Sequence, residues 1–181
     1  MSCLPLIARE SAPADVRPTL DSIHGAFGVT PNMFRTVAHS PAALASMWGS
    51  FGALGAGVLG AQLGEQIAVA VADRNGCDYC LAAHTALGRA AGVSADAMRA
   101  AQGGISEDPA TAAALLFALK LVDARGRAEE ADIAAVRAAG FSDAAIVEIV
   151  AHVALNLFTN YVNVAFAVPV DFEPVALRKA T

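Results

Sequence analysis

Apolar residues recur along most of the chain every three to four positions, the period of an amphipathic helix. The segment QLGEQIAVAVADR at residues 62–74 is one example, and the alanine- and leucine-rich segment 81–91 is another. No run of alternating apolar and polar residues lies between hairpin turn signals, as strands would require. The pattern therefore predicts an all-α fold, with helices over about 15–26, 31–38, 41–59, 61–74, 79–91, 95–101, 109–124, 128–139 and 143–165.

Capping residues support several of these helix starts. Thr30, Ser40 and Asp108 each precede a proline, which is favoured at the first helical position. Ser94 and Ser142 each follow a glycine-containing turn. We expect all five side chains to cap the helices that follow them.

The predicted helix 41–59 is unusual because it is rich in glycine. Glycines occupy positions 49, 52, 55, 57, 60 and 64, and each costs up to about 1 kcal/mol relative to alanine in a helix interior. We expect the close approach of another helix to offset this cost. Trp48, Phe51 and Leu54 add bulk for packing, so this helix is a candidate for an oligomer interface, with a place in the core as the alternative.

Two uncharged stretches, 40–64 and 149–170, are long enough to span a bilayer. The first is rich in Gly, Ala and Ser, and the second carries His152, Asn156, Asn160 and Asn163, which are costly in lipid. We interpret both as helices buried on several faces. Residues 1–5 do not resemble the start of a secretory signal. The sequence predicts no membrane partner.

Composition narrows the class of protein further. The 181 residues are 56% hydrophobic and 16% charged, which is typical of one well-filled core, so we expect a single domain over 1–181 with a core at about 15–168. The formal net charge is −5 and no Lys/Arg cluster occurs, which argues against a nucleic acid partner. Three cysteines do not form a secreted disulfide framework, so we expect a cytoplasmic location.

The residues with the clearest chemistry are a glutamate, two cysteines and a histidine. Glu65 is followed after eleven residues by Cys77, and then by Cys80 and His84. Asn75-Gly76 is a turn signal, so we expect two antiparallel helices with Cys77 at the start of the second. A helix N-terminus favours a thiolate over a thiol, which makes Cys77 a candidate nucleophile.

Helix geometry predicts how these side chains are arranged. Cys80 and His84 are four residues apart, so they share one helix face at about 6 Å along the axis. A hairpin that turns near Gly76 brings Glu65 within reach of His84 but leaves it too far from Cys80. The predicted order is carboxylate, imidazole, thiol.

The pattern Glu-x11-Cys-x2-Cys-x3-His over residues 65–84 resembles the signature of the alkylhydroperoxidase D (AhpD) family, within the wider carboxymuconolactone decarboxylase-like superfamily. The length and helical pattern resemble its peroxidase-related branch. The resemblance implies the same all-α, AhpD-like fold in a homo-oligomer, a trimer or a hexamer.

The resemblance also implies a reaction. Cys80 attacks a hydroperoxide and becomes a sulfenic acid, and Cys77 condenses with it to form a disulfide. His84, held by Glu65, relays the proton of Cys80 through water. A dithiol reductant of the lipoyl or thioredoxin-like kind restores the cysteines, and no cofactor is implied. One departure from the family pattern is Tyr79. The corresponding motif of the best-known AhpD enzymes is Cys-x-His-Cys, with a histidine at this position. Tyr79 either donates a hydrogen bond or packs.

Other interpretations of the same residues remain open. A Cys-x-x-Cys pair is also half of a structural zinc site, which typically needs two further ligands, or it is a pair of inert buried thiols. His84 alone would fit a core histidine, and Glu65 alone an acid that favours the helix dipole. At the level of function, the alternatives are a carboxymuconolactone decarboxylase-like enzyme, whose chemistry needs no dithiol, and a non-catalytic redox sensor or scaffold.

A row of asparagines adds a polar stripe to the last predicted helix. Asn156, Asn160 and Asn163 share one face, where they either satisfy buried polar groups or line a polar cavity. Glu148, Asn160 and Asn163 also repeat the spacing of Glu65, Cys77 and Cys80. A second helical hairpin that has lost its thiols would explain this repeat, and chance is the alternative.

Overall fold

All of the regular structure in the described part of the chain is helical, as predicted. The computed structural model describes residues 2–178; Met1 and residues 179–181 of the predicted domain lie outside them. The elements are the 3-10 turn η1 (Arg9–Ser11) and the α-helices α1 (Arg17–Phe27), α2 (Asn32–Val37), α3 (Pro41–Gly55), α4 (Gly60–Arg74), α5 (Asp78–Ala90), α6 (Ala95–Gln102), α7 (Pro109–Asp123), α8 (Glu130–Ala138) and α9 (Asp143–Ala165). The η1 turn was not predicted.

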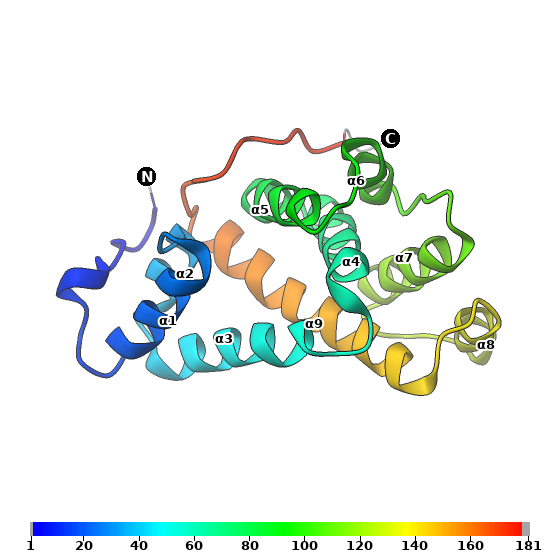
Figure 1. The fold of residues 1–181 in the computed structure, drawn as a ribbon, viewed down its shortest axis with the longest axis horizontal. Helices are drawn as coiled ribbons and strands as arrows, with labels where there is room; N and C mark the ends of the chain where they lie inside the picture. Colours follow the sequence, from blue (N-terminus) through cyan, green and yellow to red (C-terminus); the bar gives the residue numbers. More distant parts are fainter. Residues whose placement is uncertain (1, 179–181) are drawn as a thin grey trace.

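Helix α4 is the centre of the core. It packs against α5, α6, α7 and α9, and residues 67–72 within it are each no more than 2% exposed. Figure 1 shows α4 in the middle of the bundle, with α5 and α6 on one side and α3 and α9 on the other. A helix that is apolar on all faces is stable only when it is surrounded in this way.

The two terminal segments run back over the bundle (Figure 1). The N-terminal segment pairs with α2, because Ile7 N donates to Arg35 O at 3.2 Å and Arg35 Nε donates to Ile7 O at 3.1 Å. The C-terminal segment passes over α5, and Arg178 Nε donates to Asp73 Oδ2 at 3.0 Å. The same segment places Phe172 against Tyr79 at the start of α5, with ring centroids 5.7 Å apart.

Helix α3 ends at Gly55, not at residue 59 as predicted. The carboxylate of Glu148 on α9 explains the early end, because its Oε2 accepts from Val58 N at 2.7 Å and from Leu59 N at 3.2 Å. These bonds satisfy amide groups that lie between α3 and α4. A side chain at Gly57 would collide with this carboxylate, since an added Cβ would lie 2.5 Å from Glu148 Oε2.

The prediction that glycines permit close helix approach holds at only some positions. At Gly64 an added Cβ would meet His152 Cε1 at 3.0 Å, so α9 does approach α4 closely there. A Cβ added at Gly49, Gly52 or Gly55 would have no neighbouring atom within 4 Å, so the prediction is wrong for these glycines within a single chain. These three glycines lie on the exposed face of α3. Assembly into a homo-oligomer stays a prediction.

Four of the five predicted caps are confirmed. The side chains of Ser40, Ser94, Asp108 and Ser142 each accept a hydrogen bond from the backbone of the first turn that follows. Thr30 is the exception, because its Oγ1 lies 3.3 Å from His24 Nδ1 and α2 begins at Asn32. Asn32 N donates instead to Asp171 Oδ2 at 2.8 Å, a partner from the distant C-terminal segment.

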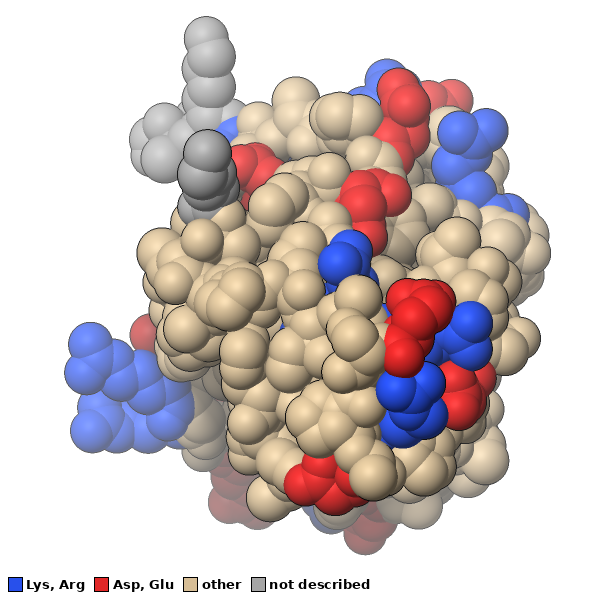
Figure 2. All heavy atoms as spheres, turned by 90° about the vertical axis from the view of Figure 1, so that its left-hand side faces the viewer, with Lys and Arg blue, Asp and Glu red and all other residues tan. Residues whose placement is uncertain are grey.

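The two uncharged stretches have different structures. Residues 40–64 are divided between α3 and α4, so they do not form one helix. Helix α9 is long and apolar enough to cross a membrane by length and composition, and 44% of its most apolar window is buried in the bundle. On the face that carries the N-terminal helices, acidic and basic side chains are interspersed and much of the surface carries neither (Figure 2).

Candidate active site

The turn between α4 and α5 brings the predicted carboxylate and imidazole together. Helix α4 ends at Arg74, and Gly76 adopts a φ of +65°, a left-handed conformation that favours glycine. The chain then reverses, and His84 Nδ1 donates to Glu65 Oε2 at 2.7 Å. His84 is only 8% exposed. A buried, carboxylate-backed imidazole of this kind has a fixed orientation.

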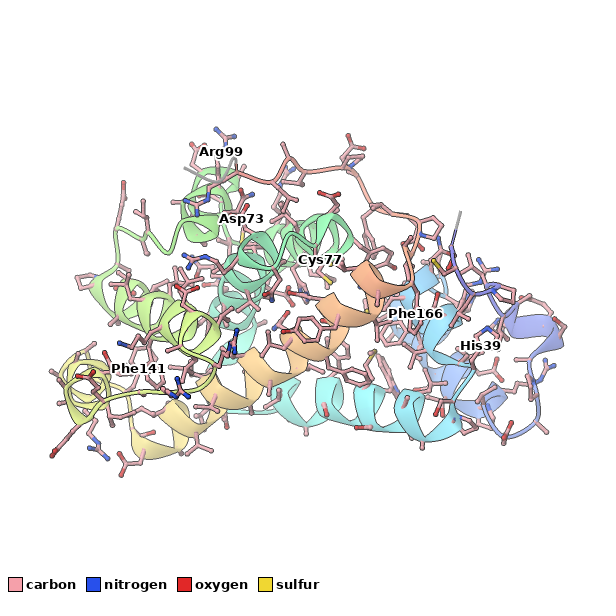
Figure 3. The ribbon with its side chains drawn as sticks, turned by 180° about the vertical axis from the view of Figure 1, so that it is seen from behind. His39, Asp73, Cys77, Arg99, Phe141 and Phe166 are labelled. Atoms are coloured by element: carbon pink, nitrogen blue, oxygen red, sulfur yellow. The ribbon has the colours of Figure 1, made fainter. Side chains whose placement is uncertain are left out.

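The two cysteines open α5 and are both buried. Cys77 is the N-cap residue, and its Sγ accepts a hydrogen bond from Cys80 N at 3.3 Å. Both cysteines are free in the structure, with exposures of 1% for Cys77 and 2% for Cys80. Figure 3 shows Cys77 between α5 and the C-terminal half of α9.

Helix α9 supplies polar groups to Cys80 that sequence reasoning did not assign. Asn163 Nδ2 donates to Cys80 Sγ at 3.1 Å, and the hydroxyl of Thr159 lies 4.0 Å from the same sulfur. Asn160 is held nearby, because its Oδ1 accepts from Asn75 Nδ2 at 2.9 Å. Two members of the asparagine stripe, Asn160 and Asn163, therefore face Cys80. The only signal in the sequence was the spacing of three polar residues on an apolar helix.

The surroundings favour ionisation of Cys80 over ionisation of Cys77. Burial opposes ionisation of Cys80, but hydrogen bonding from the Cys77 thiol, the charge of His84 and the amides of Asn163 and Asn160 together lower the pKa of Cys80 to about 6. The same thiol–thiol hydrogen bond and burial raise the pKa of Cys77. The position of Cys77 at the helix N-terminus therefore does not lower its pKa, because the hydrogen bond to the Cys80 sulfur and burial act in the opposite direction.

The histidine carries the complementary charge. Burial by itself disfavours the imidazolium, but the charge and hydrogen bond of Glu65 and the charge of Cys80 raise the pKa of His84. A thiolate and an imidazolium that stabilise each other are typical of an activated cysteine. No direct hydrogen bond joins the His84 ring to the Cys80 sulfur, although both side chains line the same cavity.

Tyr79 packs against the C-terminal segment and accepts a hydrogen bond from α2. Its hydroxyl accepts from Met33 N at 3.2 Å, and its ring contacts Phe172 edge to face. Burial is the main reason that the pKa of Tyr79 is raised, so the phenol stays protonated. Tyr79 therefore ties α5 to α2 and to the C-terminal segment beside Cys80.

A cavity of about 240 Å³ opens onto Cys80, His84 and Glu65. Its other walls are mainly apolar and aromatic: Phe27, Pro31, Met33, Phe34, Phe51, Tyr79, Ala83, Leu87 and Phe172. Such a mainly apolar site with a few convergent polar groups is typical of a small-molecule site. We call it the substrate cavity.

A second cavity of about 120 Å³ lies on the other side of the Glu65–His84 pair. His152 and Asn156 of α9 line it, and the buried His152 Nε2 and Asn156 Oδ1 have no hydrogen-bond partner. Burial lowers the pKa of His152, so this ring is neutral where His84 is charged. No three His, Cys, Asp or Glu side chains of residues 2–178 are grouped as metal ligands, which a zinc site would need.

Known proteins resemble this chain in sequence and in fold. A family model described as the carboxymuconolactone decarboxylase family matches residues 40–124, the segment that holds Glu65, Cys77, Cys80 and His84. An uncharacterized peroxidase-related protein from Silicibacter sp. TM1040 is 27% identical, with a TM-score of 0.81 over 97% of this chain and 92% of that one. The alkylhydroperoxidase AhpD core of an uncharacterized peroxidase-related protein from Ralstonia eutropha JMP134 is 28% identical, with a TM-score of 0.82 over 94% of this chain and 92% of that one.

The family match over residues 40–124 and the shared fold support a place for the chain in the AhpD-like, carboxymuconolactone decarboxylase superfamily. The debrominase Bmp8, whose C82A form was solved with 2,3,4-tribromopyrrole, shares the fold at 22% identity and a TM-score of 0.80, over 94% of each chain. No curated protein matches the chain. The superfamily contains enzymes, and the peroxidase-related members among them have the fold seen here.

The four residues predicted from the sequence lie in one neighbourhood. Glu65 contacts His84, Cys77 contacts Cys80, and His84 and Cys80 line the same cavity. The predicted second hairpin is wrong, because Glu148, Asn160 and Asn163 all lie on the single helix α9. These three residues repeat the spacing of Glu65, Cys77 and Cys80, but no turn separates Glu148 from the two asparagines.

Proposed function

We propose that this protein is a thiol-dependent peroxidase in which Cys80 attacks the hydroperoxide and Cys77 resolves the product to a disulfide. The observation that carries the proposal is the setting of the Cys80 sulfur, which receives a hydrogen bond from Asn163 and shares a cavity with the buried Glu65–His84 pair. A thiolate at neutral pH is the attacking form of cysteine. The pKa of about 6 at Cys80 supports this state.

In the first step, the Cys80 thiolate attacks one oxygen of the hydroperoxide and the O–O bond breaks. The other oxygen leaves as an alcohol after it takes a proton from the His84 imidazolium, and Cys80 becomes a sulfenic acid. Glu65 holds the ring through the 2.7 Å bond and stabilises its positive charge. Protonation of the leaving oxygen is the general-acid part of the reaction.

In the second step, the Cys77 sulfur attacks the sulfenic sulfur of Cys80. The S–O bond breaks, and the hydroxyl leaves as water with the proton of the Cys77 thiol. The raised pKa of Cys77 keeps that proton in place until this step. A dithiol reductant, of the lipoyl or thioredoxin-like kind, then returns both cysteines to thiols and leaves as its own disulfide.

The lining of the substrate cavity supports an organic hydroperoxide rather than hydrogen peroxide alone. Phe27, Phe34, Phe51 and Phe172 line the same cavity as Cys80, and such walls favour an alkyl or aryl group by burial of its apolar surface. The proposal also includes a cytoplasmic location, where thiols are kept reducible, and a homo-oligomer.

The direct test measures cumene hydroperoxide consumption with dithiothreitol as reductant. We expect Cys80→Ser to lose activity by about 1,000-fold or more, because the nucleophile is absent. Cys77→Ser should still form a sulfenic acid, trapped by dimedone, but no disulfide. Cys3→Ser is the matched control, since Cys3 is the exposed third cysteine. Activity of Cys80→Ser equal to that of Cys3→Ser would rule out the proposal.

A second candidate is the reductive removal of a halogen from a small aromatic ring. The aromatic walls of the substrate cavity favour it, as does the shared fold with a debrominase. In this reaction a C–H bond replaces the carbon–halogen bond, halide leaves, and the two cysteine thiols supply two electrons as they form the disulfide. Bromide release from a bromopyrrole without peroxide consumption would favour this candidate over the first.

A further inference from the structure

The two cysteines face different openings of the molecule. Cys80 lines the substrate cavity together with His84, whereas Cys77 lines a separate surface groove of about 230 Å³ between the start of α5 and the end of α9. Cys77 does not line the substrate cavity, and Cys80 does not line the groove. Figure 3 shows this side of the molecule, with Cys77 facing the end of α9 near Phe166.

The walls of the groove combine apolar and polar groups. Val164 and Val170 are 54% and 40% exposed at its rim, and Val168 is buried below them. Asn163 also lines the groove, is 4% exposed, and has a buried Oδ1 without a hydrogen-bond partner. The Asn163 amide thus has an acceptor that no group of the described protein uses, in the wall of the groove.

Thiol–disulfide chemistry indicates which sulfur a reductant attacks. Attack on one sulfur of the Cys77–Cys80 disulfide expels the other, and the sulfur with the lower thiol pKa leaves faster. Cys80 is that leaving group, since its sulfur is stabilised by the amide of Asn163 at 3.1 Å. The attacked sulfur is therefore Cys77, the one that faces the groove.

We propose that the groove at Cys77 is the docking site of the reducing dithiol, so that reductant and substrate reach the cysteine pair from different openings. This proposal rests on the proposed dithiol function and assigns a surface to its second partner. The depth of the sulfur identifies the kind of reductant. Cys77 is 1% exposed, so the attacking sulfur must enter the groove, which a dithiol on a slender aliphatic arm does and the broad surface of a folded protein does not.

The exchange balances in atoms and electrons. A thiolate of the reductant forms a bond to Cys77 Sγ, the Cys77–Cys80 bond breaks, and its electron pair leaves on Cys80 as the thiolate. The second thiolate of the reductant then attacks the sulfur that is joined to Cys77, and that bond breaks. Cys77 leaves with the electron pair and takes a proton, and the reductant departs as its own disulfide.

The site of attack is tested without any peroxide, so that it does not depend on the proposed substrate. The protein is oxidised with diamide, exposed briefly to the monothiol 2-mercaptoethanol, and quenched with N-ethylmaleimide. Mass-spectrometric fragmentation of the peptide that holds both cysteines then locates the two labels. We expect mercaptoethanol on Cys77 and maleimide on Cys80. The reverse assignment would overturn the proposal.

The route of entry is tested by narrowing each opening in turn. The measurement is the rate at which dihydrolipoamide reduces the diamide-formed disulfide. We expect Val164→Trp, at the groove rim, to slow reduction about 10-fold, because the larger side chain excludes the aliphatic arm of the dithiol from the groove. Val147→Trp is the matched control, because Val147 is on the same helix, is 67% exposed and lies outside the groove.

Two results would contradict the proposed route. One is that Leu87→Trp, in the substrate cavity, slows reduction while Val164→Trp does not, which would mean that the reductant enters beside the substrate. The other is faster reduction by a folded thioredoxin than by dihydrolipoamide at equal concentration, which would exclude the slender-arm reductant. Failure of peroxide turnover affects neither measurement, because diamide forms the disulfide in both.

Discussion

The α4–α5 hairpin and helix α9 contribute to the candidate site in different ways. The hairpin carries the groups that react, and they meet because Glu65 and His84 are only 19 residues apart across one tight turn. Helix α9 carries no reactive group, yet its Asn163 lies against Cys80 from 83 residues further along the chain. The hairpin thus carries the reactive groups and the two largest influences that lower the pKa of Cys80, Cys77 and His84, and α9 adds the amides of Asn163 and Asn160.

This difference agrees with the span of the family model. The matched residues, 40–124, include the whole hairpin and end before α9 begins at Asp143. The electrostatic setting of Cys80 therefore depends on a segment outside the matched region. We expect changes in the hairpin to abolish reaction steps, and changes in α9 to shift the pKa of Cys80 and leave the steps intact.

The largest expected effect within this comparison is that of His84→Asn in the hairpin. The change removes the proton donor and the positive charge beside Cys80, so peroxide-dependent oxidation of Cys80 should slow by about 100-fold. Stopped-flow measurement of thiol loss checks this rate. His39→Asn is the control, because His39 is exposed and bonds only to the backbone of Pro5 in the N-terminal segment. Equal rates for the two variants would remove His84 from the mechanism.

Asn163→Leu tests the contribution of α9 with a side chain of similar size. It removes the 3.1 Å donor to the Cys80 sulfur, and a hydrogen bond to a charged group contributes about 1.5–3 kcal/mol. The acid ionisation constant of Cys80 should therefore fall about 10-fold, which means that the pKa of Cys80 rises. Asn156→Leu is the matched control on the same face of α9, where the amide lines the second cavity. Thiolate absorbance that is the same in both variants would contradict the assigned role.

The pH dependence of Cys80 oxidation separates the two regions in one experiment. The thiolate forms as pH rises through about 6, so the rate increases there. The pKa of His84 is raised above the ordinary 6.5, so the rate falls only at a higher pH, where the imidazolium is lost. Asn163→Leu should shift the rise in rate, which follows ionisation of Cys80, to higher pH. It should leave the fall in rate, which follows loss of the His84 proton, at the same pH. A single rise centred near the pKa of free cysteine, about 8.5, is the result that this account does not permit.

The smallest expected effect is that of Glu148→Gln, at the start of α9. The carboxylate accepts from two backbone amides between α3 and α4, so its neutralisation should lower the free energy of unfolding by about 1 kcal/mol. Urea denaturation measures this change, with the exposed Glu107→Gln as control. The thiolate titration of Cys80 should not change, since Glu148 contacts α3 and α4 rather than the cysteines. A shift in that titration would show that the two ends of α9 are coupled.

The sequence predicted the hairpin well because its determinants are local. Helical spacing places Cys80 and His84 on one face, and Asn75-Gly76 signals the turn that returns the chain to Glu65. The same reasoning identified most helix starts, because a cap such as Ser40 bonds to the residue three positions ahead. Interactions within one turn or one hairpin can be predicted from spacing alone.

Interactions between distant segments could not be predicted in this way. The stripe of asparagines on α9 was visible, but its partner Cys80 is known only from the packing of α9 against α5. Likewise the end of α3 depends on Glu148, and the start of α2 on Asp171 rather than on Thr30. The helix N-terminus alone pointed to Cys77 as a thiolate, whereas the resemblance implied attack by Cys80; the amides of Asn163 and Asn160 that favour ionisation of Cys80 come from the distant α9 and could not be predicted from spacing.

The most direct test of the central claim, that Cys80 and not Cys77 is the charged sulfur, is titration of thiolate absorbance in two variants that both carry Cys3→Ser. With Cys77→Ser the remaining Cys80 should still ionise below the pKa of free cysteine, because His84 and Asn163 remain and the serine hydroxyl can donate in place of the Cys77 thiol. With Cys80→Ser the remaining Cys77 should ionise above that of free cysteine, as burial requires. A low pKa in the Cys80→Ser variant would contradict the assignment of Cys80 as the nucleophile.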